Sequence, residues 1–287
     1  PDDIETVKKD ANLDVFAGPG MLVQTFGIGK KPEILADQRV RQAFIYAIDR
    51  QSILQQDLLA GQEIVGCRVL ESPFPAGVSF DDPLAYGFDS AIATRPFDPR
   101  LGLALSRVAL YEARAADKQA GRPETKELPE LVLAHPADDV ARTACRAIRA
   151  QWQAIGIRAE PRSTEVGVWL DLRTVTFDYY ISTNLDFPTI DPDVYLYDTF
   201  HSNSAPAGWD AWSDPELDAL LEQGHATVDV AERQAIFTQA QKLMVERCAA
   251  FWSYAQNFVT VLQPNVMGFE PHPSGYPFGL TRTWIQQ

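Results

Sequence analysis

Residues 37–54 have the sequence DQRVRQAFIYAIDRQSIL and carry the most specific fold signal in the chain. Apolar side chains recur there at the three- and four-residue spacing of an amphipathic helix. They are Val40, Ala43, Phe44, Ala47 and Ile48. Asp37 precedes them as a potential N-cap, and Gly61 follows as a stop signal. The pattern predicts a helix over residues 37–60 with a break near Ser52.

Three further helices carry start signals of their own. Asp98 precedes Pro99, and Asp214 precedes Pro215. A proline at the first helical position costs nothing, because its missing N–H would have no helical partner. Asp229 opens a capping-box pattern, with a glutamate three residues later. The expected spans are 97–113, 214–224 with Gly224 as the stop, and 229–249 with a buried stripe of Ile236, Ala240, Leu243 and Met244.

Helical and strand patterns alternate through the rest of the chain. The polar run at 113–127 predicts a solvated connector. A helix over 138–156 should end at Gly156, which suits a left-handed cap. Its buried stripe is expected to contain Val140, Ala144, Ile148, Trp152 and Ile155. Strands are expected at 128–135, 157–163, 177–183 and 249–264, with a short helix at 165–174. This order is typical of an α/β domain.

Composition excludes several classes of protein. The 287 residues are 46% hydrophobic, which suffices for one large domain or two ordinary ones. The formal net charge of -14 would repel phosphate backbones, so nucleic acid is excluded as a partner. No apolar run approaches the roughly 18 residues of a membrane-spanning helix. Cys67, Cys145 and Cys248 are far apart and predict buried free thiols. Because Pro1 is not an initiator and no signal-peptide core follows, we expect a processed form or a fragment.

Three segments carry a resemblance to one family. Residues 37–54 match its pattern D-x-R-V-R-x-A-x-x-x-A-I-D-R. Residues 97–109 resemble its next helix, which opens with Asp-Pro, and residues 212–246 resemble a later pair of helices with Arg233 inside the second. The order and spacing hold over most of residues 17–280. The chain thus resembles the extracytoplasmic peptide-type solute-binding proteins of ABC importers, which include oligopeptide, dipeptide and nickel binders.

The resemblance implies an α/β, periplasmic binding protein-like fold of the type II, peptide-binding cluster. Family members are longer and close two lobes on a ligand. This chain would be mainly the second lobe: residues 1–28 form a hinge-crossing segment, 29–255 the C-terminal α/β lobe and 256–287 a return segment towards the first lobe. Such a protein captures a peptide-like or other small solute and delivers it to ABC permease subunits in the membrane. The resemblance further implies a monomer without a cofactor, in the periplasm or another extracytoplasmic space, with or without a lipoprotein anchor.

The candidate binding residues lie in and around LDFPTIDPDVYLYDTF, residues 185–200. In peptide binders of the family, a strand ends here in an aspartate that pairs with the ligand's amino group, and the resemblance assigns that role to Asp186. The other candidate ligand-binding residues are Thr183, Asn184, Phe187, Asn203 and Trp209. Four residues separate Asp186 from Asp191 where the family usually has two, and an ungapped match would place Pro188 at the anchor. A turn or capping role for Asp186 therefore stays open, and Asp191 and Asp193 are expected to cap the helix that follows.

Rival interpretations of the same stretch have less support. Two of its aspartates would suit the acid and base of a glycoside hydrolase, but no other motif supports catalysis. The run DFPTIDPD lacks the alternating ligands and central glycine of an EF-hand. Scattered histidines predict surface or packing roles rather than a metal site; they are His135, His201, His225 and His272. A nickel chelate or haem-type cargo stays open, as does a ligand-sensing receptor lobe without transport. We expect a binding protein and not an enzyme.

Overall fold

A six-stranded sheet forms the centre of the molecule, with strand order β2-β6-β1-β5-β3-β4. The computed structural model describes residues 6–10, 12–28, 33–74, 92, 95–165, 181–186, 191–203, 214–248, 250–270 and 278–287. β3 is parallel to β4 and β5, whereas β1 is antiparallel to β5 and β6, and β2 is antiparallel to β6. The strands are β1 (Asp14–Ile28), β2 (Arg68–Val69), β3 (Leu131–Pro136), β4 (Ala159–Thr164), β5 (Ile181–Asp186) and β6 (Ala250–Leu262), while β7 (Val266–Met267) and β8 (Trp284–Ile285) pair separately.

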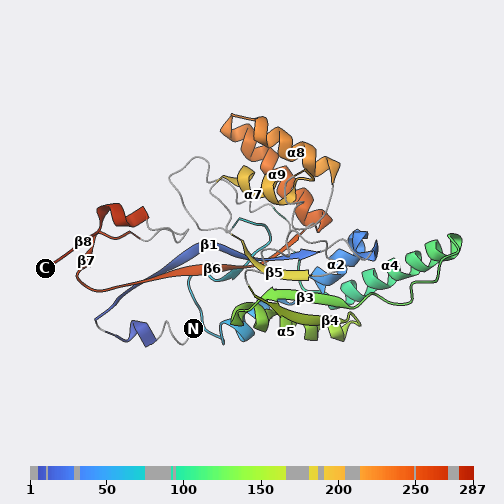
Figure 1. Ribbon diagram of the computed structural model, residues 1–287, viewed down its shortest axis with the longest axis horizontal. Coiled ribbons are helices and arrows are strands. Elements are labelled where there is room, and N and C mark those ends of the chain that lie inside the picture. Colours follow the sequence, from blue (N-terminus) through green and yellow to red (C-terminus); the bar gives the residue numbers. More distant parts are fainter. Residues whose placement is uncertain are drawn as a thin grey trace.

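Helices cover both faces of the sheet, as an α/β architecture requires. Figure 1 shows α7, α8 and α9 on one side of the sheet and α5 on the other, beside β3 and β4. The α-helices are α2 (Gln38–Tyr46), α3 (Arg50–Ser52), α4 (Pro99–Gln119), α5 (Asp139–Ala154), α7 (Pro192–Phe200), α8 (Pro215–Ala226) and α9 (Val230–Arg247). There are also two 3-10 helices, η1 (Glu33–Ala36) and η3 (Phe278–Arg282), and a π-helix, η2 (Ile53–Leu58), among the described residues. Within the described residues, none of the helices is long and apolar enough to cross a membrane.

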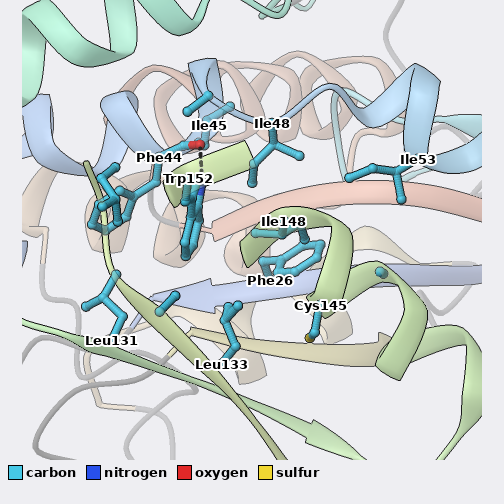
Figure 2. Packing of buried hydrophobic residues seen from close by; sticks show 14 of the residues in the cluster. Phe26, Phe44, Ile45, Ile48, Ile53, Leu131, Leu133, Cys145, Ile148 and Trp152 are labelled. Atoms are coloured by element: carbon cyan, nitrogen blue, oxygen red, sulfur yellow. Dashed lines mark hydrogen bonds between the residues drawn. The ribbon is translucent and has the colours of Figure 1, made fainter. Parts of the chain in front are cut away.

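The larger hydrophobic core lies on the α5 side of the sheet and centres on Trp152 (Figure 2). The Trp152 ring is buried, and its centroid lies 5.1 Å from that of Phe44. Its indole Nε1 donates a hydrogen bond of 3.0 Å to the Phe44 carbonyl, so the ring's one polar atom is satisfied. Leu131 and Leu133 of β3 belong to the same cluster. This core therefore joins α5, α2 and the sheet.

The second core lies on the other face, which we call the α7–α9 side. Its members include Val23 of β1, Leu196 of α7, Leu217 of α8 and Met244 of α9. The predicted stripe of α9 is buried as expected: Ile236, Ala240, Leu243 and Met244. Gly224 is not the predicted stop, because α8 continues to Ala226. A Cβ on Gly224 would lie 2.6 Å from Cζ of Phe237, so the glycine permits the close approach of α8 and α9.

The predicted helix starts are confirmed by their cap hydrogen bonds. The aspartate side chains accept backbone N–H bonds at Asp37 (from Arg39, 2.8 Å), Asp98 (from Leu101, 2.9 Å), Asp214 (from Glu216, 3.0 Å) and Asp229 (from Glu232, 2.9 Å). The side chain of Arg39 also donates to Asp37, which holds the pKa of that carboxyl below its usual range against the opposing effect of burial. Local capping chemistry thus sets where these helices begin.

The helix predicted over residues 37–60 is broken earlier than expected. α2 ends at Tyr46 and a new helix starts at Arg50, so the main break precedes the predicted position near Ser52, where α3 gives way to the π-helix η2. Asp49 causes the change, because its side chain accepts from the Ser52 N–H at 2.9 Å and caps the new helix. The Asp49 N–H is in turn held by Oε1 of Gln151 in α5, at 2.7 Å. Gly61 follows in the left-handed region, as the stop signal predicted.

Two other boundaries differ from the sequence prediction. α4 runs to Gln119, seven residues into the connector expected at 113–127. Asp117 stabilises this last turn by accepting from the Thr125 backbone N–H at 2.9 Å and hydroxyl at 2.7 Å. In α5, Val140 is 41% exposed because it lies in the first turn, and Ala141 and Cys145 are buried instead. The rest of the predicted stripe is buried at Ala144, Ile148 and Trp152, and Ile155 is partly buried.

The predicted strands are present wherever the structure describes them. β3, β4 and β6 match the expected segments, and β5 covers the expected strand from Ile181 onward. The short helix expected at 165–174 lies outside the described residues beyond Glu165. All three cysteines are free thiols; Cys145 and Cys248 are buried as predicted, whereas Cys67 is only half-buried. Burial raises the pKa of Cys248 to about 11.

Candidate functional site

The candidate site lies where the connections of the parallel strands change direction. From β3 the chain passes to β4 on one side, and from β4 it returns to β5 on the other side of β3. Ligands of open α/β sheets bind outside the carboxyl ends of the strands at such a switch point. β3 and β5 are parallel, so Pro136 and Asp186 end their strands at the same edge of the sheet. Asp186 therefore occupies the position at which a ligand is expected.

The backbone of the predicted binding segment is fixed by pairing with β1. Asp186 lies opposite Val23, Asn184 opposite Thr25 and Thr183 opposite Phe26. The pair of Asp186 and Val23 belongs to a row of paired residues that runs across the sheet. This row continues from Val23 to Ala255 of β6, and from Ala255 to Arg68 of β2. Asp186 and Arg68 are thus the two ends of one row that crosses four strands.

Buried polar atoms without partners occur along the strands next to this row. Gln24 Oε1, Thr25 Oγ1 and Ser253 Oγ are enclosed and lack a hydrogen-bond partner within the described part of the chain. Nε and Nη2 of Arg68 are enclosed and unpaired in the same way. Burial alone lowers the pKa of Arg68. Since most buried polar groups are hydrogen-bonded, this concentration marks β1, β6 and β2 as unusual.

An ion cluster fixes the chain at Asp191 and Asp193, inside the predicted binding stretch of residues 185–200. Asp191 caps α7, accepting from the Asp193 N–H at 3.0 Å, as predicted. Asp193 is not a cap but a first-turn residue, and its Oδ2 lies 3.2 Å from Nη2 of Arg233 and 2.8 Å from Nδ1 of His225. Nη1 of Arg233 binds Asp191 at 2.9 Å, and its Nε donates to the Gly224 carbonyl at 3.1 Å. These contacts join α7, α8 and α9 and occupy both aspartates.

A second cluster holds the start of the segment that leads to Trp209. His201 is buried, and its ring stacks on Tyr197 with centroids 4.4 Å apart. Its Nδ1 accepts from the Asn203 N–H at 3.1 Å, so Nε2 carries the proton in the neutral ring and faces Oε1 of Glu222 at 3.3 Å. His201 therefore has the packing role that the sequence predicts, and it orients the backbone at Asn203.

The structure places the predicted ligand-binding residues unequally. The backbones of Thr183, Asn184 and Asp186 share one strand, and Asn203 is exposed just after α7. Phe187 and Trp209 lie outside the described residues. Sequence reasoning did not single out Arg68. Its one local signal is that a charged residue stands between Cys67 and Val69. Within the described ranges, no group of three or more histidine, cysteine, aspartate or glutamate side chains could hold a metal ion.

Comparison with known proteins finds similarity along the whole chain. Residues 1–207 match the family described as bacterial extracellular solute-binding proteins, family 5 middle. The chain is 22% identical over 281 residues to the dipeptide-binding protein of Escherichia coli strain K12, covering 96% of this chain and 48% of that protein. It is 28% identical over 255 residues to a probable deoxycholate-binding periplasmic protein of the same organism, covering 88% and 43%.

Solved structures have the same fold. The oligopeptide-binding protein AppA from Bacillus subtilis, in complex with a nonapeptide, superposes with a TM-score of 0.81 at 20% identity. The match covers 100% of this chain and 55% of that one. The predicted periplasmic binding protein-like α/β fold is therefore confirmed. This chain spans about half the length of the curated relatives it matches.

Proposed function

The chain belongs to the family 5 bacterial extracellular solute-binding proteins, and from this premise we propose that it is one lobe of the substrate-binding component of an ABC importer. The lobe would capture a peptide-like or other small solute against a second lobe and deliver it to permease subunits in the membrane. Lobe closure would bury the solute, so function depends on differential affinity for the closed state. The proposed protein is a monomer outside the cytoplasmic membrane, free or held by a lipid anchor.

The single observation that carries this proposal is the position of Asp186. It ends β5 at the switch point of the parallel strands, in the register fixed by Val23. We propose that its carboxylate pairs with a cationic group of the solute, because a charge-assisted hydrogen bond is strong in a partly dry cleft. The other proposed ligand-binding residues are Thr183, Asn184, Phe187, Asn203 and Trp209.

The long ribbon of β1 and β6 supports the proposed division of the chain. In Figure 1 these strands run away from the sheet towards β7 and β8 at the C-terminal end. Large apolar side chains are exposed on this ribbon and on β8, among them Phe16 of β1 at 40% and Trp284 of β8 at 55%. Such surface suits contact with a second lobe. We therefore propose residues 1–28 and 256–287 as the segments that cross to it, and residues 29–255 as the binding lobe.

Relatives suggest the class of solute. Their names refer to dipeptides, oligopeptides, deoxycholate and heme, and one solved structure is in complex with Ni(L-His)2. We propose a peptide-like or other small solute that carries a cationic group, because Asp186 is proposed to pair with it. The relatives are binding proteins, and we propose no catalysis here, since Arg233 already holds Asp191 and Asp193. A sensory receptor would use the same cleft, and only the solute's transport across the membrane separates the two roles.

Solute identification in the full-length protein tests the proposal. Small molecules released after native purification would be identified by mass spectrometry, and their affinity measured by calorimetry. We expect Asp186→Asn to weaken binding about tenfold or more, because an ionised hydrogen bond is replaced by a neutral one. Asp198→Asn is the matched control, since Asp198 is exposed on α7. Equal affinity in the wild type and Asp186→Asn would refute the anchor, and a protein without any bound solute would refute the importer role.

A further inference from the structure

Helix α4 presents apolar side chains on two opposite faces. One face packs on α2 so closely that a Cβ on Gly102 would lie 2.9 Å from the Ala43 carbonyl oxygen. The opposite face is open to solvent, yet it carries Leu101, Val108 and Tyr111, and Tyr111 is 74% exposed. A surface helix needs one apolar face to join the core, so the fold does not account for the second one.

The exposed apolar residues of α4 form a seam along the helix. They recur at intervals of three and four residues, which is the spacing of positions a and d in a heptad repeat. The seam consists of Leu101, Ala104, Val108, Tyr111 and Ala115. A stripe of this width is the surface along which one helix packs against another, whereas a lipid surface takes a broader apolar face rich in Trp, Phe and Leu. The seam therefore fits a helix.

A row of arginines borders the seam on one side. Arg100, Arg107 and Arg114 follow at intervals of seven residues, each directly before a seam residue. Arg100 and Arg107 are exposed, whereas Arg114 also donates to two backbone carbonyls of the connector after α4. Charges beside a seam select the partner helix. In a chain with a formal net charge of -14, this arginine row is a local reversal of sign, and it favours a partner with an acidic flank.

Two other occupants of the seam fit less well. The second lobe lies elsewhere, because Figure 1 shows α4 at the end of the molecule opposite to β7 and β8, where the ribbon proposed to reach that lobe ends. A second copy of the chain packed antiparallel would set one arginine row against the other. Packed parallel, it would offer each row only Glu112, which Arg39 already binds at 2.6 Å.

We propose that the α4 seam is a docking surface for an acidic amphipathic helix of a partner protein. Apolar side chains of that helix pack against Leu101, Val108 and Tyr111, and its carboxylates pair with Arg100 and Arg107. Docking buries the exposed seam, which supplies affinity, while the charge pairs set the choice of partner. The inference stands apart from the proposed solute site, because none of the proposed ligand-binding residues belongs to α4.

Binding of a synthetic helix to the full-length protein tests this surface. The probe is a fluorescein-labelled peptide of about three heptads, with leucine at positions a and d and glutamate at the flanking positions e and g. Its like charges keep it from pairing with itself. In fluorescence anisotropy at low salt, the wild type should bind this peptide about tenfold more tightly than the same peptide with lysine at e and g. Added salt should reduce the difference.

Substitutions on α4 identify the residues responsible. Val108→Glu places a charge in the seam and should weaken binding about tenfold or more. Val228→Glu is its matched control, because Val228 is also exposed but lies after α8. Arg107→Glu should lose the preference for the acidic peptide and bind the lysine peptide better than the wild type does, a gain that a misfolded variant could not show. Arg146→Glu, at an exposed arginine of α5, should change neither affinity.

Several results would overturn the proposal. A wild type that binds neither peptide, or binds both equally, would exclude an acidic helix as the partner. Unchanged affinity in Val108→Glu would place any binding away from the seam. If the protein instead forms a dimer in analytical ultracentrifugation that Val108→Glu abolishes, the seam belongs to a second copy. If it instead binds vesicles of phosphatidylcholine and phosphatidylglycerol and Val108→Glu abolishes this, the seam belongs to a lipid surface.

Discussion

Removal of Arg233 should destabilise the protein strongly, because this side chain neutralises two carboxylates at once. Its side chain is 10% exposed, and those of its partners Asp191 and Asp193 are 28% and 11% exposed. The distances are 2.9 Å and 3.2 Å. Its guanidinium also lies 5.2 Å from the ring centroid of Phe237. Arg233→Met would leave a buried carboxylate at Asp193 without its main counter-charge.

The expected magnitude follows from the burial of each partner. Breaking a buried ion pair from one side costs about 3–5 kcal/mol. Asp191 is exposed enough to recover hydration, and Asp193 keeps its 2.8 Å contact with His225. We therefore expect a loss near the lower end, about 3 kcal/mol, in the free energy of unfolding. Adding Asp193→Leu should restore much of this loss, because the unpaired carboxylate is then absent.

Urea unfolding followed by circular dichroism measures these values, with the m value as a check that the unfolding transition is unchanged. Arg247→Met is the matched control on the same helix. Arg247 pairs with Glu216 at 3.0 Å, where the two side chains are 37% and 65% exposed, and it lies 4.0 Å from Asp214. Such a surface pair contributes about 0–1 kcal/mol. If Arg233→Met costs no more than Arg247→Met, the ion cluster is not a structural clamp and our reasoning fails.

Two further substitutions test the helices around the site. Gly224→Ala should destabilise the protein by about 1–3 kcal/mol in urea unfolding, because the new Cβ would overlap the Phe237 ring. Gly224→Ala with Phe237→Leu should cost less than the sum of the single changes, and strict additivity would contradict the overlap. The side chain of Arg39 lowers the pKa of Asp37 in the folded protein. The Asp37 carboxylate therefore stabilises the fold fully above its unfolded pKa of about 4, and this stabilisation is lost as the pH falls through the lower pKa of the folded protein. The stability difference between wild type and Asp37→Asn, measured by thermal unfolding, should be constant from pH 8 to pH 5 and shrink below about pH 4; a constant difference down to pH 2 would contradict this.

Helix starts were predictable from sequence because their chemistry is local. At Asp98 and Asp214 the cap accepts from N–H groups two or three residues later, and the proline sets the first helical φ. Helix ends were less predictable. Gly224 stays helical because Phe237 of another helix packs over it, and α4 extends because Asp117 meets Thr125 eight residues later. Neither contact leaves a mark in the local sequence pattern.

The same limit applies to the candidate site. Asp186 was predicted through the family pattern, and its register against Val23 depends on a strand far away in the chain. Arg68 could not be singled out, since what distinguishes it from Arg50 is the absence of an acceptor within the described residues. The sequence shows where a charge lies but not which partners the fold brings to it. Unsatisfied groups are a property of the three-dimensional packing alone.

The backbone is fixed independently at Asp186 and at Asp191. Asp186 is held by backbone pairing with β1, which is itself paired along its length with β6. Asp191 is held by Arg233 of α9. A strand pairing and an ion cluster on separate elements therefore fix these two positions. Because β1 and β6 also form the ribbon proposed to reach the second lobe, a change in the position of that lobe acts on the same strand that sets the register of Asp186. The proposed closure of the lobes would therefore act on the position of Asp186 through β1.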